Sequence, residues 1–279
     1  MAELYLRKVV LTILPEAGSG KVIEDLRIKF SCEKTNESSP NNAEIEIYNL
    51  SEATRSQLEA KNTRVQLAIG YLGLSPDGVG FGIGGSSTVE TVFVGDVVKT
   101  VQKIESPDII TTIEVADGDN KYRNARLEKG YPPNTKLNPV FDDLEKSIGL
   151  SRGVREGVPE KTYAHGLTLS GLSRDHLDVL TRSNALEWSV QDETLQIIPE
   201  GQGTSESLIL LSPDSGLIGS PNKTKKGVEF ISLIQPKLRP GRRVQVDSRL
   251  VKGIFKIRKV THEGDSHEGD FLSKCEATT

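Results

Sequence analysis

The tetrapeptide His-Glu-Gly-Asp occurs twice near the end of the chain, at residues 262–265 and 267–270. The two copies place two histidines and four carboxylates within nine residues, in a chain that has only 4 histidines. Imidazole and carboxylate groups bind zinc and also carry protons in catalysis. The segment is therefore a candidate metal site, a candidate acid–base centre, or a polar loop, and its neighbours must decide.

Both neighbours of this segment have the alternating pattern of strands, GIFKIRKVTH before it and DFLSKCEA after it. A Gly- and Asp-rich stretch between two strands is typical of a hairpin connection. His262 and His267 are expected on either side of the turn, where a cross-strand pair could hold zinc with Asp265 or Asp270. Structural zinc usually takes more thiolate or imidazole than this, so we favour a solvated hairpin tip.

Two glycine-rich motifs suggest phosphate binding, but their surroundings do not fit it. A GxGxxG pattern at Gly80, Gly82 and Gly85 is followed by a strand-like segment, whereas a dinucleotide site needs a helix there. We expect a loop between two strands. The GSGK at 18–21 lacks the Ser or Thr that follows the lysine of a phosphate-binding loop, and it predicts a hairpin turn.

The remaining histidines and the cysteines offer no recognisable catalytic spacing. His165 and His176 have no Ser or Cys partner nearby in the sequence and are expected to be ordinary polar groups. Cys32 and Cys275 each lie in a strand-like alternation, which favours two buried thiols; a disulfide between them stays open. The sequence thus predicts no catalytic residues, no cofactor-binding residues or cofactor, no metal ligands and no enzymatic activity.

Composition limits the class of protein. Of 279 residues, 35% are hydrophobic and 27% are charged, and the net charge is −4. A nucleic-acid-binding protein needs a basic footprint to neutralise phosphates, and none is present. No apolar stretch approaches the roughly 20 residues of a membrane span, and the N-terminus lacks a signal-peptide pattern. We expect a soluble protein made in the cytoplasm, with no membrane partner.

Alternation with period two dominates the first part of the chain and predicts half-buried antiparallel strands. One helix is expected after Ser51, whose hydroxyl can cap EATRSQLEAKN. Residues 4 to about 117 therefore resemble a barrel or sandwich with one inserted helix. The predicted inward residues of three strands are Leu26, Ile28, Phe30, Cys32, Ala43, Ile45, Ile47, Val65, Leu67, Ile69 and Tyr71.

The pattern changes near residue 120. Residues 121–139 are polar with two adjacent prolines and predict a linker. A helix is then expected with Asn138 as N-cap, Pro139 in its first position and Gly149 at its end. A second helix, capped by Ser173, should bury Leu177, Val179 and Leu180. A hairpin turning near Asp192 and Glu193 follows, with Trp188 in the core of this α+β unit.

Residues 201–207 predict a second linker, and strands return after it. No internal sequence repeat is present, so any relation between the first and last β regions would be structural. The expected strands of the last region are SLILLS, GVEFISLIQP, RRVQVDS, GIFKIRKVTH and DFLSKCEA.

Several segments, in the same order, resemble bacteriophage baseplate (tail) hub proteins. In the last region the resemblance covers Ser212–Pro221, Gly227–Ser248 and Gly253–Asp265, and a His-Gly-Asp hairpin recurs there in the family. The second HEGD copy departs from that pattern. Earlier segments that resemble the family are NNAEIEIYNLSEATRSQL, VQLAIGY, VFVGDV and HGLTLSGLSRDHLDVLTRSNALEWSVQDETLQIIPEG.

The resemblance implies a mainly β fold in which two tube-type antiparallel β-barrel domains, 1–120 and 205–279, flank an α+β domain at 121–204. It implies a homotrimer whose six barrels join the hexameric tail tube, or a distal tail protein, to a central spike or tail-tip protein. A tape measure protein is a further candidate partner. DNA would pass through the lumen without specific binding. The implied location is the virion tail baseplate, assembled in the host cytoplasm.

Two other hypotheses stay open. A metal-dependent hydrolase acting at the host envelope would use the HEGDSHEGD segment, although no residues remain for a separate catalytic domain. The same hub module could also serve a contractile injection system or a phage-like bacteriocin.

Overall fold

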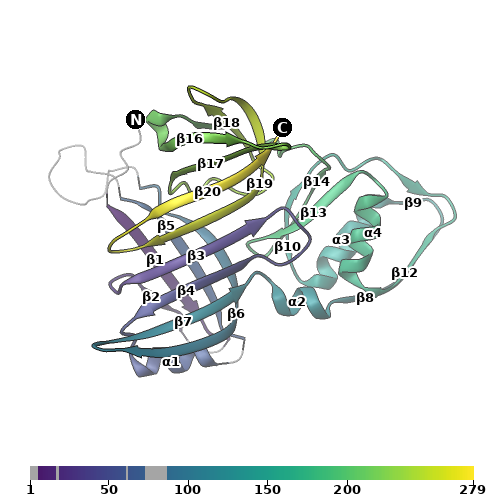
Figure 1. Cartoon of the computed structure of the whole chain (residues 1–279). Coiled ribbons are helices and arrows are strands. Elements are labelled where there is room, and N and C mark those ends of the chain that lie inside the picture. The colour runs from purple at the N-terminus through teal and green to yellow at the C-terminus, as the bar shows by residue number, and fades with distance from the viewer. Residues whose placement is uncertain (1–5, 17–18, 61, 73–86) are drawn as a thin grey trace.

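The computed structural model describes residues 6–16, 19–60, 62–72 and 87–279. The glycine-rich segment with Gly80, Gly82 and Gly85 lies outside these ranges. The chain is mainly β, with four α-helices among the described residues. A β-rich body formed by the first and last regions lies beside an α+β unit formed by the middle region (Figure 1).

The first region contains the predicted strands and the predicted helix. Ser51 caps α1, and its side chain accepts the backbone N–H of Thr54. The predicted period-two burial is confirmed in β3, β4 and β5. The elements are β1 (Arg7–Leu14), β2 (Lys21–Ile23), β3 (Ile28–Thr35), β4 (Asn42–Tyr48), α1 (Glu52–Glu59), β5 (Arg64–Tyr71), β6 (Glu90–Glu105) and β7 (Asp108–Ala116).

The predicted linker at 121–139 is wrong. It holds a short helix and β8, which pairs antiparallel with β12. β8 is exposed at most positions, so it lacks the apolar alternation that reveals a strand. The elements of the middle region are α2 (Asp119–Asn124), β8 (Arg126–Tyr131), β9 (Thr135–Lys136), α3 (Leu137–Ile148), β10 (Ser151–Arg155), β11 (Thr162–Tyr163), β12 (Leu167–Leu172), α4 (Ser173–Arg182), β13 (Leu186–Gln191) and β14 (Thr194–Pro199).

Helix boundaries in this unit differ slightly from the prediction. α3 begins at Leu137, so Asn138 lies inside its first turn and is not the cap; Gly149 ends it in the left-handed conformation, as predicted. Ser173 is the first residue of α4 and not its cap. Val179 is 65% exposed, because two residues turn a helix by about 200° and carry it away from buried Leu177.

The last region contains the five predicted strands and one more, β16, which its Gly, Ser, Pro and Asn residues concealed. Residues 201–207, predicted to be a linker, contain no helix or strand. The elements are β15 (Ile209–Leu211), a 3-10 turn (Pro213–Ser215), β16 (Leu217–Lys223), β17 (Gly227–Leu233), β18 (Arg243–Asp247), β19 (Lys252–Asp265) and β20 (Phe271–Thr278).

One continuous sheet joins the first and last regions. Its strand order is β16-β17-β20-β19-β3-β4-β7-β6-β5-β1-β2, with β18 and β15 branching from β19. The link is the antiparallel pair β3–β19, which runs from Lys259 opposite Thr35 to Asp265 opposite Lys29. In Figure 1 the last strands lie directly against β3. Among the described residues, the path has free ends at β16 and β2.

Two long strands turn the corners of this sheet. β6 pairs with β5 up to Asp96 and then with β7, with a register shift between Val97 and Lys99. β19 pairs with β18 and then with β20, with a register shift between Ile257 and Lys259. A bulge bends a strand and increases its twist, so each of these strands belongs to two layers.

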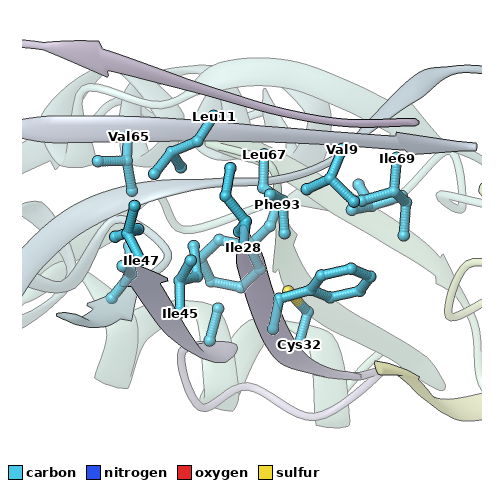
Figure 2. Packing of buried hydrophobic residues seen from close by; sticks show 14 of the residues in the cluster. Val9, Leu11, Ile28, Cys32, Ile45, Ile47, Val65, Leu67, Ile69 and Phe93 are labelled. Atoms are coloured by element: carbon cyan, nitrogen blue, oxygen red, sulfur yellow. The ribbon is translucent and has the colours of Figure 1, made fainter. Parts of the chain in front are cut away.

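Three clusters of buried hydrophobic residues form the core. The first fills the space between the layers of the first region (Figure 2), and it also includes Ile234 and Phe271 of the last region. The second lies in the α+β unit and contains Trp188, which is 3% exposed, as predicted. The third lies between strands of the last region.

Candidate functional site

The two histidines of the repeated tetrapeptide occupy different surroundings. His262 lies inside β19, is 1% exposed, and shares a hydrogen bond of 2.9 Å between its Nδ1 and the hydroxyl of Ser273. His267 is exposed in the turn between β19 and β20. Burial, followed by the charge of Lys34, lowers the pKa of His262 to about 3. The predicted solvated tip is therefore correct for His267 and wrong for His262.

The carboxylate of Asp265 is committed to contacts within the protein. Arg27 donates to its Oδ2 from Nε at 2.9 Å and from Nη2 at 2.7 Å. The backbone N–H of His267 donates to its Oδ1 at 2.9 Å. Burial alone would raise the pKa of Asp265, but the hydrogen bonds from Arg27 and His267 hold it below its ordinary value. Asp265 therefore closes the hairpin against β3.

These positions do not assemble the zinc arrangement considered for the segment. Within the described ranges, no group of three or more His, Cys, Asp and Glu side chains is spaced to hold a metal ion. The hydrolase hypothesis depended on His262 and His267 acting together, and the structure gives it no support. The HEGDSHEGD segment is a strand end and a turn.

The other candidate side chains are two cysteines of the continuous sheet and two histidines of the α+β unit. Cys32 and Cys275 are free and buried, as predicted, and burial raises the pKa of Cys32 to about 12 despite the opposing charge of Lys34. His165 is exposed and His176 is half-buried in the α+β unit. That they are ordinary polar groups stays a prediction.

A charged face covers the outer side of the continuous sheet from β17 to β6. The strand registers place its members on one face, opposite to the buried residues. We call the following residues the acidic face: Glu33, Glu44, Glu46, Glu114, Glu229, Glu263, Glu276, Lys29, Lys99, Lys259 and Lys274.

The acidic face carries a net negative charge. Its seven carboxylates outnumber its four lysines, and each lysine pairs with one of the carboxylates, for example Lys99 with Glu114 at 2.8 Å and Lys259 with Glu33 at 2.8 Å. Such a surface repels phosphate groups. Alternation with period two predicts the outward-facing residues of single strands, but the registers that join these residues across β3 and β19 follow only from the fold.

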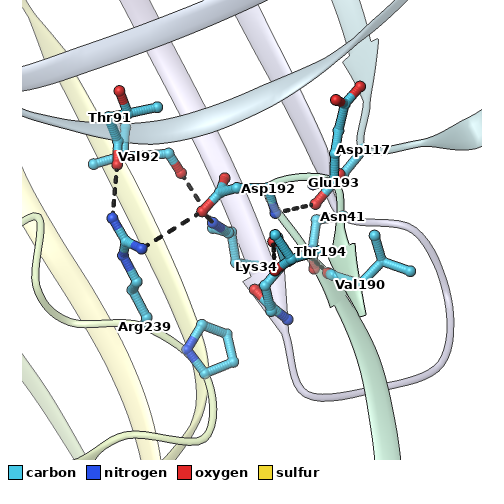
Figure 3. A network of polar contacts seen from close by, with 12 residues as sticks. Lys34, Asn41, Thr91, Val92, Asp117, Val190, Asp192, Glu193, Thr194 and Arg239 are labelled. Atoms are coloured by element: carbon cyan, nitrogen blue, oxygen red, sulfur yellow. Dashed lines mark hydrogen bonds and ion pairs between the residues drawn. The ribbon is translucent and has the colours of Figure 1, made fainter. Parts of the chain in front are cut away.

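A buried polar network attaches the α+β unit to the sheet (Figure 3). The turn between β13 and β14 extends toward β3 and β7. Lys34, 1% exposed, donates to Asp192 Oδ2 at 2.7 Å and to the carbonyl of Val92 at 3.1 Å. Asp117 at the end of β7 accepts the backbone N–H groups of Asp192 at 2.7 Å and Glu193 at 2.9 Å.

The carboxyl group of Asp117 has an unusually high pKa in this network. Burial raises the pKa of Asp117 to about 6, and the charge of Asp192 adds to this effect, whereas Lys34 and the two amide hydrogen bonds oppose it. Asn41 contributes a further link by donating to the carbonyl of Val190 at 2.7 Å. Because a buried ion pair is costly to break, the network holds the α+β unit in one position.

The sequence contained a partial signal for this network. The predicted hairpin turn at Asp192 and Glu193 is confirmed, and both residues have positive φ, as a two-residue type I′ turn requires. Lys34 continues the inward positions of β3 after Ile28, Phe30 and Cys32. A lysine at a core position signals a buried partner, but nothing in the sequence identifies Asp192 as that partner.

The chain matches one protein family over nearly its whole length. The family described as Baseplate hub gp41 matches residues 6–277. No curated protein matches the chain.

Solved structures with a similar fold come from phage tails and a secretion system. The 43 kDa tail protein of prophage MuSo2 from Shewanella oneidensis has a TM-score of 0.65 at 12% identity, covering 98% of each chain. A tail protein from Neisseria meningitidis MC58 has a TM-score of 0.64 at 10% identity, covering 99% of this chain and 97% of its own. The E. coli c3393 protein, a type VI secretion component described as similar to T4 tail proteins gp27 and gp5, has a TM-score of 0.61 at 11% identity. The match covers 95% of this chain and 76% of the c3393 protein.

Proposed function

The chain belongs to the family of baseplate hub gp41 proteins, and from this premise we propose that it forms a trimeric ring that adapts a hexameric tail tube to a central spike or tail tip. The role is structural and involves no catalysis. The proposed location is the tail baseplate of a virion, with assembly in the host cytoplasm.

One observation carries this proposal: the first and last β regions repeat the same strand order. The path β5-β6-β7-β4-β3 of the first region corresponds to β18-β19-β20-β17-β16 of the last. The corner strands β6 and β19 have their register shifts at corresponding places. A subunit with two such modules lets three copies present six similar modules, which is the geometry needed between a threefold and a sixfold partner.

The repeat extends to single residues, although the sequences are unrelated. In the first region Ser31, Glu44, Glu114 and Lys99 lie opposite one another across four strands. The last region places Asn222, Glu229, Glu276 and Lys259 in the same order. Each row ends at the lysine that follows the register shift of the corner strand.

We assign the domains 1–120 and 205–279 to the two tube-type modules and 121–204 to the α+β domain. The three hydrophobic clusters support this division, and the β3–β19 pair joins the two modules. Their closure into barrels would be completed in the ring.

The acidic face suits the lining of a channel for DNA. Phosphate groups are repelled by a surface whose carboxylates outnumber its lysines, so DNA would slide through without specific binding. The tail tube or a distal tail protein would contact one side of the ring, and the spike or tail-tip protein the other. A tape measure protein is a further proposed partner within the channel. Among the described residues no helix is long and apolar enough to cross a membrane.

The test is the position of this chain in intact particles. Immunogold electron microscopy with an antibody to the chain should label the distal end of the tail. Native mass spectrometry of the complex released from the tail should give three times the subunit mass of 30.5 kDa. Unlabelled particles with the chain free in the lysate would overturn the proposal.

A further inference from the structure

Besides the outer edges of β2 and β15, two strand edges of the continuous sheet have no partner among the described residues. β16 pairs with β17 on one side, and its other side is free. The second half of β6, residues 97–105, pairs with β7 on one side, while β5 reaches only to Asp96 on the other. An unpaired edge presents a row of backbone N–H and C=O groups that can pair with another strand.

The chain itself shows how such edges are joined. β3 holds the position in the first module that β16 holds in the last, and β19 holds the position of β6. β3 and β19 pair with each other in antiparallel register. The pair that corresponds to β3–β19 is therefore β16 with β6, and these two edges remain available.

We propose that β16 of one copy pairs antiparallel with the second half of β6 in a neighbouring copy, in the register of the β3–β19 pair. This inference rests on the proposed ring and identifies the residues that close it. The contact is head-to-tail, because β16 and β6 are different surfaces, and contacts of that kind close into rings.

The internal pair fixes the expected register. Ser31 of β3 lies opposite Glu263 of β19, four residues beyond Lys259. Asn222 takes the place of Ser31 in the repeated row, and four residues beyond Lys99 is Lys103. Asn222 of one copy should therefore lie opposite Lys103 of the next.

Burial supports this assignment. In β19 the half that meets β3 is buried or half-buried throughout, whereas almost every residue of β6 from Val98 onward is exposed. Val101 is 44% exposed and Ile104 is 78% exposed. Exposed apolar side chains on an unpaired strand edge favour association with another strand. On the opposite edge Ile218 of β16 is 40% exposed. In the proposed register Ile104 lies opposite Pro221, so the strand pair would cover Ile104.

Disulfide trapping tests the register. The double variant Lys103→Cys/Asn222→Cys should form covalent oligomers up to the trimer when particles carrying it are mildly oxidised and separated on a non-reducing gel. The control Lys99→Cys/Asn222→Cys places the cysteines on the same face but about 13 Å apart along the strand, and should not cross-link. The native Cys32 and Cys275 are buried, so each single variant should remain monomeric on the gel.

A second pair of variants tests the edge without disulfides. Ile104→Asp should raise the dissociation constant of the trimer at least tenfold, because it places a charge in the proposed strand pair. Ile254→Asp is the matched control, since Ile254 is 55% exposed on the half of β19 that pairs with β18, and it should leave the trimer unchanged. As isolated monomers, both variants should have the same melting temperature as the native protein.

The outcomes separate this inference from the proposed function. A trimer that is labelled at the tail end, but shows no Lys103–Asn222 cross-link and tolerates Ile104→Asp, would overturn the strand pairing and leave the hub role intact. Equal cross-linking of the two double variants would overturn the register. A chain that never appears in particles would remove both proposals.

Discussion

The ring of Phe271 in β20 packs edge-on against the ring of Phe30 in β3, with centroids 5.9 Å apart and planes at 84°. Phe271 makes a second edge-on contact with Tyr71 at 5.4 Å. A residue near the end of the chain thus completes the core of the first module, and the two β regions are coupled through side chains as well as through the β3–β19 pair.

Replacing Phe271 with Ala should lower the free energy of unfolding by about 3–5 kcal/mol, the usual cost of truncating a buried aromatic side chain. Urea denaturation followed by circular dichroism measures this change. Leu250→Ala is the control, because Leu250 is 66% exposed and its truncation should cost less than about 0.5 kcal/mol. A loss below about 1 kcal/mol for Phe271→Ala would show that the two β regions fold independently.

Replacing Lys34 with Met should lower the free energy of unfolding by about 3 kcal/mol. It removes the buried cation at 2.7 Å from Asp192 and leaves that half-buried carboxylate with only Arg239, at 3.9 Å. Lys99→Met breaks an exposed pair and should cost no more than about 1 kcal/mol. In the double variant Lys34→Met/Asp192→Asn the loss should be smaller than the sum of the two single losses. Additive losses in urea denaturation would mean that the pair contributes nothing specific.

Asp117 should titrate near pH 6 in the folded protein, against an ordinary value of 3.8. A raised carboxyl pKa means that the folded state binds the proton more tightly than the unfolded state. Its contribution to stability is therefore complete below pH 3.8 and is lost as the pH rises through about 6. Carbon-13 NMR of the carboxyl group measures the midpoint.

The Lys34→Met variant checks the cause of that midpoint. Lys34 lowers the pKa of Asp117, so its removal should move the NMR midpoint to higher pH. A midpoint at or below about 4 in the native protein would contradict the burial of this carboxylate.

His262→Gln should make the protein less sensitive to acid. The pKa of His262 falls from 6.5 to about 3 on folding, so the unfolded state binds the proton first. Its contribution to stability is present above pH 6.5 and is lost as the pH falls toward 3, by at most about 1.4 kcal/mol per pH unit. The difference in unfolding free energy between native and variant protein, measured from pH 7 to pH 4, isolates this term.

His267→Gln is the matched control for this experiment, because His267 lies in the same hairpin but in its exposed turn. Its stability should follow the native protein across the pH range. Equal effects of the two substitutions would show that His262 is accessible to protons in the folded state.

Local pattern accounts for most of the elements. Ile28, Phe30 and Cys32 alternate with polar residues, and this alternation was sufficient to predict β3 and its buried face. β8 and β16 were missed because they bury few apolar side chains and are held by backbone pairing with β12 and β17. Val179 is apolar, but the helical angle carries it to the exposed face of α4, so the prediction that it is buried is wrong.

Local sequence patterns predict the β-rich first and last regions, the α+β unit between them, the resemblance to baseplate hubs, and the hairpin at Asp192 and Glu193. These features depend on short-range periodicity and turn chemistry, which neighbouring residues set. Three features follow only from the three-dimensional fold: β3 pairs with β19, Lys34 contacts Asp192, and His262 is buried whereas His267 is exposed. The first two depend on strand register between segments more than a hundred residues apart, and no local pattern encodes which distant strand becomes the neighbour. The third depends on where β19 ends, because His262 lies within the strand and His267 lies in the turn after it.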